Sequence, residues 1–216
     1  MLDKNSYDIT EFLHDYTQDS PDKEIKIINA AINTFSEKGF DATRTKEIAE
    51  RAGIAEGTIF RYFPTKNAIL ERMVPLLIRV MLPKISKPIE QILIDYNDAP
   101  MQSIFRAILL DRIQMIRDNE RFIKSVLPEL IHRAPLLKQM RESILPMIEQ
   151  YVTKVIDYGK ARGEVATDLD PHMAMLQLLG FILSYTMFSG APERDETSEV
   201  ERFLDCAMKG WNGTCR

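Results

Sequence analysis

The sequence predicts an all-helical (all-α) protein of about nine helices, and three observations support this prediction. Apolar residues return at helical spacing along most of the chain, whereas no segment sustains the alternation that is typical of a β-strand. Residues 45–63 can be drawn as two short amphipathic helices that meet at a tight bend. With 216 residues and a hydrophobic fraction of 45%, the chain is long enough to bury a sizeable core.

The first twenty residues are polar and acidic, and we expect residues 1–20 to form a flexible arm. The first long helix should start with Ser20 as its N-cap and Pro21 at its first position, and it should end at Gly39. Its apolar face carries Ile25, Ile28, Ile32 and Phe35.

The next nineteen residues have the pattern of a helix-turn-helix. Apolar residues share one face of each short helix: Ile48, Ala49 and Ala52 in the first, Ile59 and Phe63 in the second. Gly53 lies between them, where a left-handed backbone is easiest for a residue without a Cβ, and Ile54 closes the corner. In such a motif the second helix enters the major groove of DNA.

Residues 24–73 closely resemble the amino-terminal domain of the tetracycline-repressor (TetR) family of bacterial transcription regulators. The resemblance rests on the Lys-Gly-Phe exit of the first helix at 38–40, the Thr-x-x-Ile-Ala start at 45–49 and the Gly-Thr-Ile-Phe-Arg-Tyr-Phe run at 57–63. It extends without a gap over about the first third of the chain. It implies that the arm at 1–20 is followed by a DNA-binding domain at 21–72 and by a helical effector-binding and dimerisation domain at 73–212.

The amino-terminal residues of the second short helix are the candidates for reading bases. Ala55 and the Thr58 methyl group could touch a thymine methyl, and Gly57 allows a close backbone approach. Glu56 could accept a hydrogen bond from a cytosine amino group, but it also repels phosphate. The resemblance places the same four residues where the family approaches bases.

A second set of residues is expected to contact the DNA backbone. Thr45 offers a hydroxyl at a helix amino terminus, Tyr62 its phenol, and Arg61 and Lys66 their charges. The resemblance assigns backbone contact to Thr45, Tyr62 and Lys66. The remaining candidates are Arg44 and Lys46. Arg51 is expected on a solvated face instead.

The remaining chain is predicted to be helical throughout. One helix should begin at Lys66, capped by Thr65, with Pro75 as a possible kink, and the domain boundary is expected near residues 70–75. Later helices are indicated by the apolar spacing in 104–115, 122–130 and 136–155. Two further starts are predicted, at Asp170-Pro171 and at a capping box formed by Ser198 and Glu201.

Residues 173–183 are apolar on nearly every side, so a helix there must be buried on every side. We expect it to pair with its copy in a homodimer, as the family resemblance implies; a fully intramolecular core is the alternative. The predicted interface residues are Met175, Leu176, Leu179, Leu183, Phe203 and Met208.

The middle helices are expected to enclose a small-molecule effector, because the resemblance implies a ligand pocket there. The candidate lining residues are apolar or soft: Phe105, Ile108, Met115, Phe122, Met140, Met147, Tyr151 and Phe181. Methionines at helical spacing are more often plain core, so the alternative is ordinary packing. His132, Arg106 and Arg112 could supply polar anchors, although an ordinary surface position or a satisfied interior position is favoured for each.

Several function classes are disfavoured. The net charge of −4 argues against a chain that grips nucleic acid over its whole surface, but not against a local DNA-binding face. No signal peptide or membrane-spanning run is recognised, which favours a cytoplasmic protein without a membrane partner. Cys206 is expected to be a buried thiol and Cys215 a thiol at the frayed end. Neither a metal site nor a cofactor is predicted.

The expected function is a ligand-responsive transcriptional regulator, a repressor that binds a palindromic double-stranded DNA operator as a homodimer. A small hydrophobic effector would release it. The alternatives are a helical enzyme and a helical protein-interaction adaptor. The enzyme is disfavoured because the three histidines lie far apart in sequence and no HExxH, GxSxG or phosphate-binding glycine loop occurs.

Overall fold

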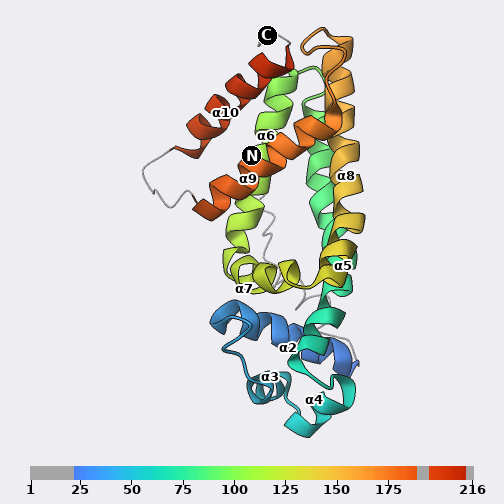
Figure 1. Ribbon diagram of the computed structural model, residues 1–216, viewed down its shortest axis with the longest axis vertical. Helices are drawn as coiled ribbons and strands as arrows, with labels where there is room; N and C mark the ends of the chain where they lie inside the picture. The colour runs from blue at the N-terminus through green and yellow to red at the C-terminus, as the bar shows by residue number, and fades with distance from the viewer. Residues whose placement is uncertain (1–21, 189–194, 213–216) are drawn as a thin grey trace. The chain divides into compact units, whose positions relative to one another are not determined.

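The computed structural model describes residues 22–188 and 195–212, without the side chains of residues 77, 79–85, 187 and 188. These ranges contain nine helices and no strand, which confirms the all-helical prediction (Figure 1). The expected arm at 1–20 and Cys215 lie outside the described residues. In chain order the helices are α2 (Lys23–Lys38), α3 (Thr45–Ala52), α4 (Glu56–Tyr62), α5 (Lys66–Asp95), α6 (Met101–Asp118), α7 (Glu120–Ile131), α8 (Ala134–Ala161), α9 (Pro171–Phe188) and α10 (Glu196–Trp211).

The helices pack into two compact units. Among the described residues, the first unit comprises 22–83 and 118–143, and the second comprises 84–117, 144–188 and 195–212. The segment 118–143 belongs to the first unit because α7 packs on α2. The predicted boundary between residues 72 and 73 separates a DNA-binding domain from an effector-binding domain, whereas the two units are defined by packing. That boundary stays a prediction.

Helix α2 anchors the first unit. The Asp22 carboxylate accepts a hydrogen bond from the Glu24 backbone N–H at 2.9 Å and caps the helix start. The helix therefore begins at Lys23, and the prediction of Ser20 as its cap is wrong, because the Asp22 carboxylate is the group that binds the first turn. The apolar face of the helix is fully buried from Ile27 to Phe35. Gly39 ends the helix with φ at 84°, in the region that favours glycine. The predicted end of this helix is therefore confirmed.

The corner between α3 and α4 forms as the sequence predicts. Gly53 has φ 68° and ψ 34°, the left-handed conformation. The Gly53 N–H donates to the Glu50 carbonyl and the Ile54 N–H to the Ala49 carbonyl, which is the Schellman pattern that satisfies the last carbonyls of α3. Ile48 and Ile59 are completely buried at this corner. The two short helices are therefore held at a fixed angle by backbone geometry and by packing together.

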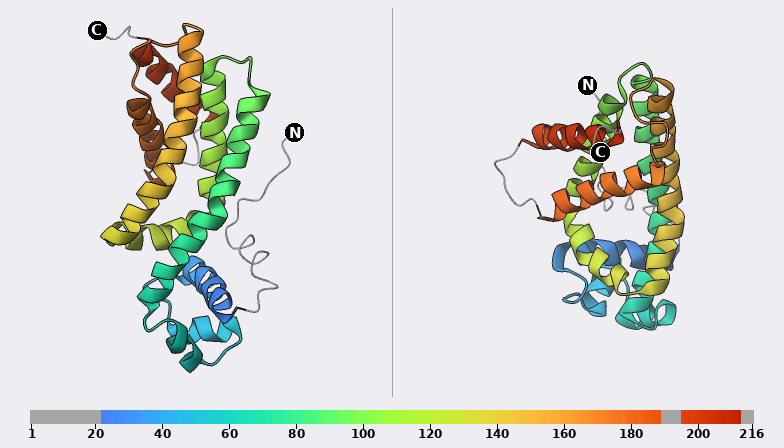
Figure 2. Two further views of the ribbon diagram at one scale, coloured as in Figure 1. Left: turned by 90° about the vertical axis from the view of Figure 1, so that its right-hand side faces the viewer. Right: turned by 45° about the horizontal axis from the view of Figure 1, so that its top comes forward.

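Helix α5 follows the stop that Pro64 imposes on α4. The Thr65 hydroxyl accepts from the Ala68 N–H at 3.1 Å, so Thr65 is the predicted cap. In the second unit, the α5 residue Glu90 accepts a hydrogen bond from the Tyr151 hydroxyl of α8 at 2.7 Å. Figure 2 shows the corresponding stretches of α5 and α8 side by side.

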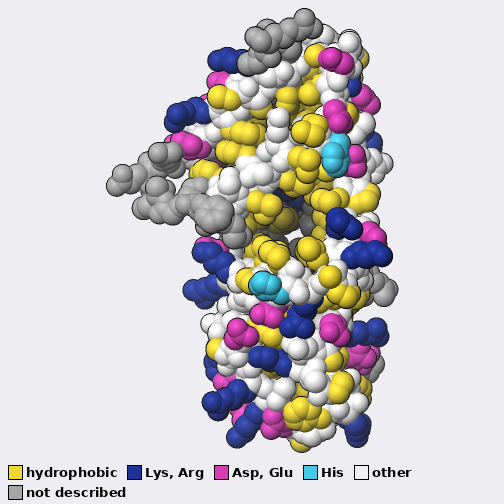
Figure 3. All heavy atoms as spheres, in the orientation of Figure 1, with side chains coloured by type: hydrophobic (Ala, Val, Ile, Leu, Met, Phe, Trp, Pro, Cys, Tyr) yellow, Lys and Arg dark blue, Asp and Glu magenta, His cyan; other side chains and the backbone are white. Residues whose placement is uncertain are grey.

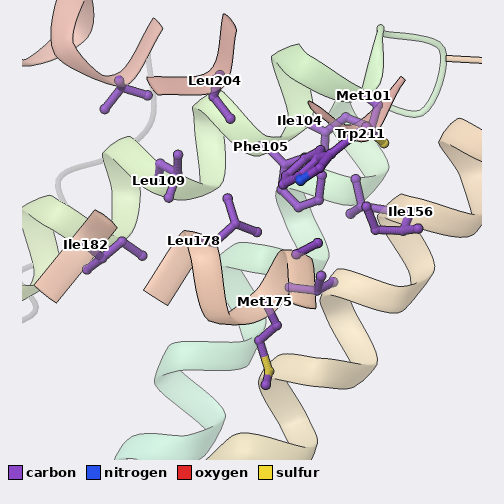
Figure 4. Close-up of a cluster of buried hydrophobic side chains, with 14 of the residues drawn as sticks. Met101, Ile104, Phe105, Leu109, Ile156, Met175, Leu178, Ile182, Leu204 and Trp211 are labelled. Carbon is purple, nitrogen blue, oxygen red and sulfur yellow. The ribbon is translucent and has the colours of Figure 1, made fainter. Parts of the chain in front are cut away.

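The second unit has one continuous apolar core. Figure 4 shows residues of α6, α8, α9 and α10 meeting in it. The Trp211 ring lies edge-on to Phe105, with the ring centroids 5.6 Å apart. The Trp211 indole N–H donates to the Gln177 side-chain oxygen at 2.8 Å, so this buried ring also satisfies its polar atom. The end of α10 is thereby tied to α6 and α9.

Two details of the second unit differ from the sequence predictions. Helix α10 starts before the expected capping box, because Asp195 accepts from the backbone N–H of Ser198 at 3.1 Å and so serves as the N-cap. The start of α9 at Pro171, with Asp170 as its cap, is confirmed. Cys206 is exposed rather than buried, because it lies on the outward side of α10.

No helix in the described ranges is both long and apolar enough to cross a membrane.

Candidate nucleic-acid interface

The amino-terminal end of α4 is presented outward while its other side is held in the first unit. Ile59 is completely buried and Phe63 is nearly so, and these two side chains fix the helix. Ala55 and Gly57 are exposed, whereas Glu56 and Thr58 are partly exposed. A helix that is anchored on one side and open at its amino-terminal end has the geometry needed to enter a major groove.

Phe60 is a candidate contact residue that the sequence analysis missed. Its side chain is 49% exposed on α4, although phenylalanine is usually buried. The signal was present in the helical periodicity, because inward positions at Ile59 and Phe63 leave Phe60 on the flank of the helix. An exposed ring here can pack against a thymine methyl group or a sugar.

Thr45 and Glu56 are brought together across the corner. The Thr45 hydroxyl donates to the Glu56 carboxylate at 2.7 Å. A threonine hydroxyl has a single hydrogen to donate, so in this arrangement it is committed to Glu56. A phosphate oxygen that takes this hydrogen must first displace the carboxylate. The expected backbone contact of Thr45 and the expected base contact of Glu56 are therefore linked to each other.

The start of α3 is stabilised by Glu47. One carboxylate oxygen accepts from the Arg44 backbone N–H at 3.0 Å, and the other lies 2.5 Å from the Lys38 ammonium. The Arg44 N–H and then Lys38 lower the pKa of Glu47 below its usual value, because both favour the charged carboxylate. The carboxylate thus holds the α2 exit and the first turn of α3 together.

The contacts of Lys66 differ from the contact with the DNA backbone that the sequence suggests. Its ammonium donates to the carbonyls of Phe40, Asp41 and Thr43, at 2.6, 3.1 and 3.1 Å. It also lies 4.4 Å from the centre of the Phe40 ring. Its hydrogen-bond partners are therefore within the protein, in the turn between α2 and α3.

The other basic side chains near the helix-turn-helix differ in their exposure and in their partners within the protein. Arg44 and Lys46 are exposed at the start of α3. The Arg61 guanidinium lies 5.8 Å from the centre of the Tyr62 ring, and that ring is 38% exposed. Arg51, by contrast, donates to both carboxylate oxygens of Glu37 at 2.6 and 2.8 Å.

The eight candidate effector residues are divided between the two units. Phe122 and Met140 belong to the first unit, and the other six belong to the second. Phe105 is packed against Trp211, while Phe181 stacks on Phe203 with the ring centroids 4.2 Å apart. These two rings already have aromatic partners, so the structure favours the core alternative for both in this conformation.

The candidate dimer residues divide into three groups by their exposure. Met175 is completely buried in its own protomer, so its prediction as an interface residue is wrong: it faces the core rather than the outer side of α9. Leu176 and Leu183 are 45% and 49% exposed, and Met173 on the same side is also exposed. Leu179, Phe203 and Met208 are partly buried against the core. Figure 3 shows apolar side chains gathered over α9 and α10.

Comparison with known proteins identifies the amino-terminal region. Residues 27–73 match the family model described as bacterial regulatory proteins, tetR family. The HTH-type transcriptional regulator RutR of Escherichia coli K12 is 27% identical over 182 residues, which cover 81% of this chain and 82% of RutR. The fatty acid metabolism regulator protein of Bacillus subtilis 168 is 24% identical over 163 residues, covering 74% and 79% of the two chains.

A solved structure shares the fold over nearly the whole length. The transcriptional regulator FadR from Bacillus subtilis, in complex with stearoyl-CoA, aligns with a TM-score of 0.62 and 23% identity. The alignment covers 86% of this chain and 98% of FadR. The family match falls on the helix-turn-helix, and the relatives extend the likeness through the remaining helices. The chain belongs to the tetR family of bacterial regulatory proteins and is a DNA-binding transcriptional regulator.

Proposed function

We propose that this protein is a ligand-responsive repressor that binds a palindromic operator as a homodimer. One observation carries the proposal: α4 is fixed by buried Ile59 and Phe63 while its amino-terminal end, from Ala55 to Thr58, is left open. These open residues meet base edges in the major groove. Thr45, Arg61, Tyr62, Arg44 and Lys46 meet the phosphates on either side.

The homodimer follows from the size of one helix-turn-helix and from the surface of α9. A single recognition helix reads only a few base pairs, and two copies about 34 Å apart read a two-fold site. Leu176 and Leu183 lie seven residues apart on one exposed side of α9, and covering two half-exposed leucines stabilises an association. A second copy of the same helix supplies a matching apolar surface.

The effector is a small molecule with a substantial apolar part, bound in the second unit. The apolar character of the candidate lining supports this, as do the stearoyl-CoA complex of FadR and the name of the fatty acid metabolism regulator. The proposed lining residues are Ile108, Met115, Met147 and Tyr151, with Phe105 and Phe181 exposed to ligand only when their aromatic partners move. A coupling of about 1–3 kcal/mol between effector and operator is typical of such regulators.

Selection of duplexes from a random pool tests the proposal directly. The full-length protein is expected to enrich one palindromic sequence and to protect both half-sites in a footprint. Adding a long-chain acyl-CoA, with a short-chain acyl-CoA as the matched control, is expected to weaken retention of that sequence. Enrichment of no sequence, or recovery of a single half-site by a monomeric protein, contradicts the homodimeric repressor.

A further inference from the structure

The ammonium of Lys66 has all its hydrogen-bond donors engaged inside the protein. A lysine ammonium carries three N–H donors, and three carbonyl oxygens lie within 3.1 Å of Nζ, those of Phe40, Asp41 and Thr43. The ring of Phe40 lies beside the same cation, at 4.4 Å from its centre. A phosphate oxygen can accept a hydrogen bond from this group only if one of the carbonyls gives up its own.

These three carbonyls belong to the turn that delivers the chain into α3. The turn is closed by the Thr43 N–H, which donates to the Phe40 carbonyl at 3.2 Å, and by the Thr43 hydroxyl, which donates to the Gly39 carbonyl at 2.7 Å. Helix α3 begins at Thr45, two residues later. The position of the Thr45 hydroxyl therefore depends on a turn that is pinned by a residue of α5.

Phe40 joins a third element to the same turn. Its side chain is buried, and its ring lies 5.0 Å from that of Phe35 in α2. The Arg133 guanidinium, just after α7, lies 5.8 Å from the Phe40 ring centre and also donates to the Asn67 side-chain oxygen at 2.9 Å. The turn is thus held from α2, from the start of α5 and from the end of α7.

We propose that Lys66 is a positioning residue that holds the 40–43 turn and thereby sets the start of α3 against DNA, rather than a phosphate ligand. The proposal rests on the DNA-binding function proposed above and revises one contact within it. A compact ammonium can direct three donors at convergent carbonyls, whereas the planar fork of arginine cannot. Arginine, however, binds phosphate at least as well as lysine does. The two roles therefore predict opposite outcomes for K66R.

The first test compares K66R with K66M on the full-length protein, using a duplex recovered by selection with the unmodified protein. A positioning role predicts that both variants lose affinity about ten-fold, because hydrogen bonds from a charged group are lost in each. K66R keeps the charge, so its dependence of affinity on salt stays unchanged. K124R, at an exposed lysine of α7 in the same unit with no proposed DNA contact, is the matched conservative control and should keep normal affinity. Normal duplex affinity of K66R overturns the proposal.

A second readout needs no DNA. The positioning role predicts that amide hydrogen exchange over residues 43–48 speeds up about ten-fold in both variants, while exchange in α9 is unaffected. A phosphate ligand is idle without DNA, so unchanged exchange at 43–48 overturns the proposal. If neither variant folds, NMR of the Lys66 ammonium in the unmodified protein replaces these tests. Its hydrogens should exchange slowly with water, and its nitrogen chemical shift should stay unchanged when the duplex is added. A large change in that chemical shift on DNA addition overturns the proposal.

Failure of the two proposals can be told apart. If the unmodified protein enriches no duplex, the DNA-binding repressor fails, while the exchange and resonance measurements still report on the turn. If a duplex is enriched but K66R binds it normally, only the positioning role fails.

Discussion

Replacing Glu56 by Gln should strengthen binding to duplex DNA of arbitrary sequence. The Glu56 carboxylate holds the Thr45 hydroxyl at 2.7 Å, so a phosphate that replaces it there comes within about 4 Å of a like charge unless Glu56 turns away. Two unit charges at that distance repel by about 1 kcal/mol in a water-like dielectric. Removing the charge should raise affinity about five-fold for each subunit and about thirty-fold for a dimer, if both subunits contribute independently.

Fluorescence anisotropy with a labelled 30-bp random-sequence duplex measures this effect at constant salt. Glu71→Gln is the matched control, because it changes the charge equally on an exposed residue of α5 in the same unit. Thr45→Val should erase part of the gain, since the two side chains share one hydrogen bond, and a double-mutant cycle isolates that coupling. An E56Q protein no tighter than E71Q would refute the linked contact.

Three further predictions concern the dimer, the core and pH. Leu183→Glu should produce a monomer in analytical ultracentrifugation and abolish operator binding, because it places a charge on the exposed apolar side of α9; a stable dimer contradicts that interface. Met175→Ala should lower the free energy of unfolding by about 2–5 kcal/mol while preserving dimerisation at equal folded concentration, because its side chain is buried within the protomer. Glu47, whose pKa is lowered first by the Arg44 N–H, contributes stability above its ordinary pKa of about 4.3 and loses it as pH falls further. Thermal unfolding of E47Q between about pH 3 and pH 7 should therefore show a smaller loss on acidification than the unmodified protein.

Local features were predicted well because they depend on neighbours in sequence. Gly39, Gly53 and Pro64 end helices through their own backbone preferences, and all three ends lie where the sequence places them. The start of α10 was misplaced because two caps compete within four residues, and the Asp195 carboxylate is the one that binds the backbone. Periodicity fixed the identity of each long helix but not which side of it meets another protomer.

In the candidate site too, local features were predicted and contacts between distant residues were not. The sequence placed Ala55, Gly57 and Thr58 at the open end of α4, because Ile59 and Phe63 fix the helix by their spacing. It did not find exposed Phe60, and it could not assign a partner to Lys66. The apolar run, read with the family resemblance, also placed Met175 at the dimer interface. On a helix that is apolar nearly all round, hydropathy does not distinguish the side that faces the core from the side that faces outward.

The sequence by itself determined the all-helical class, the helix-turn-helix and the family, since each follows from periodicity, glycine placement and a continuous run of motif residues. Only the tertiary structure decided which polar groups meet. The Thr45 hydroxyl finds a carboxylate eleven positions away, and the Lys66 ammonium finds a carbonyl twenty-six positions away. Side chains at such separations are brought together by the angles between packed helices, and those angles depend on the whole core rather than on any local pattern.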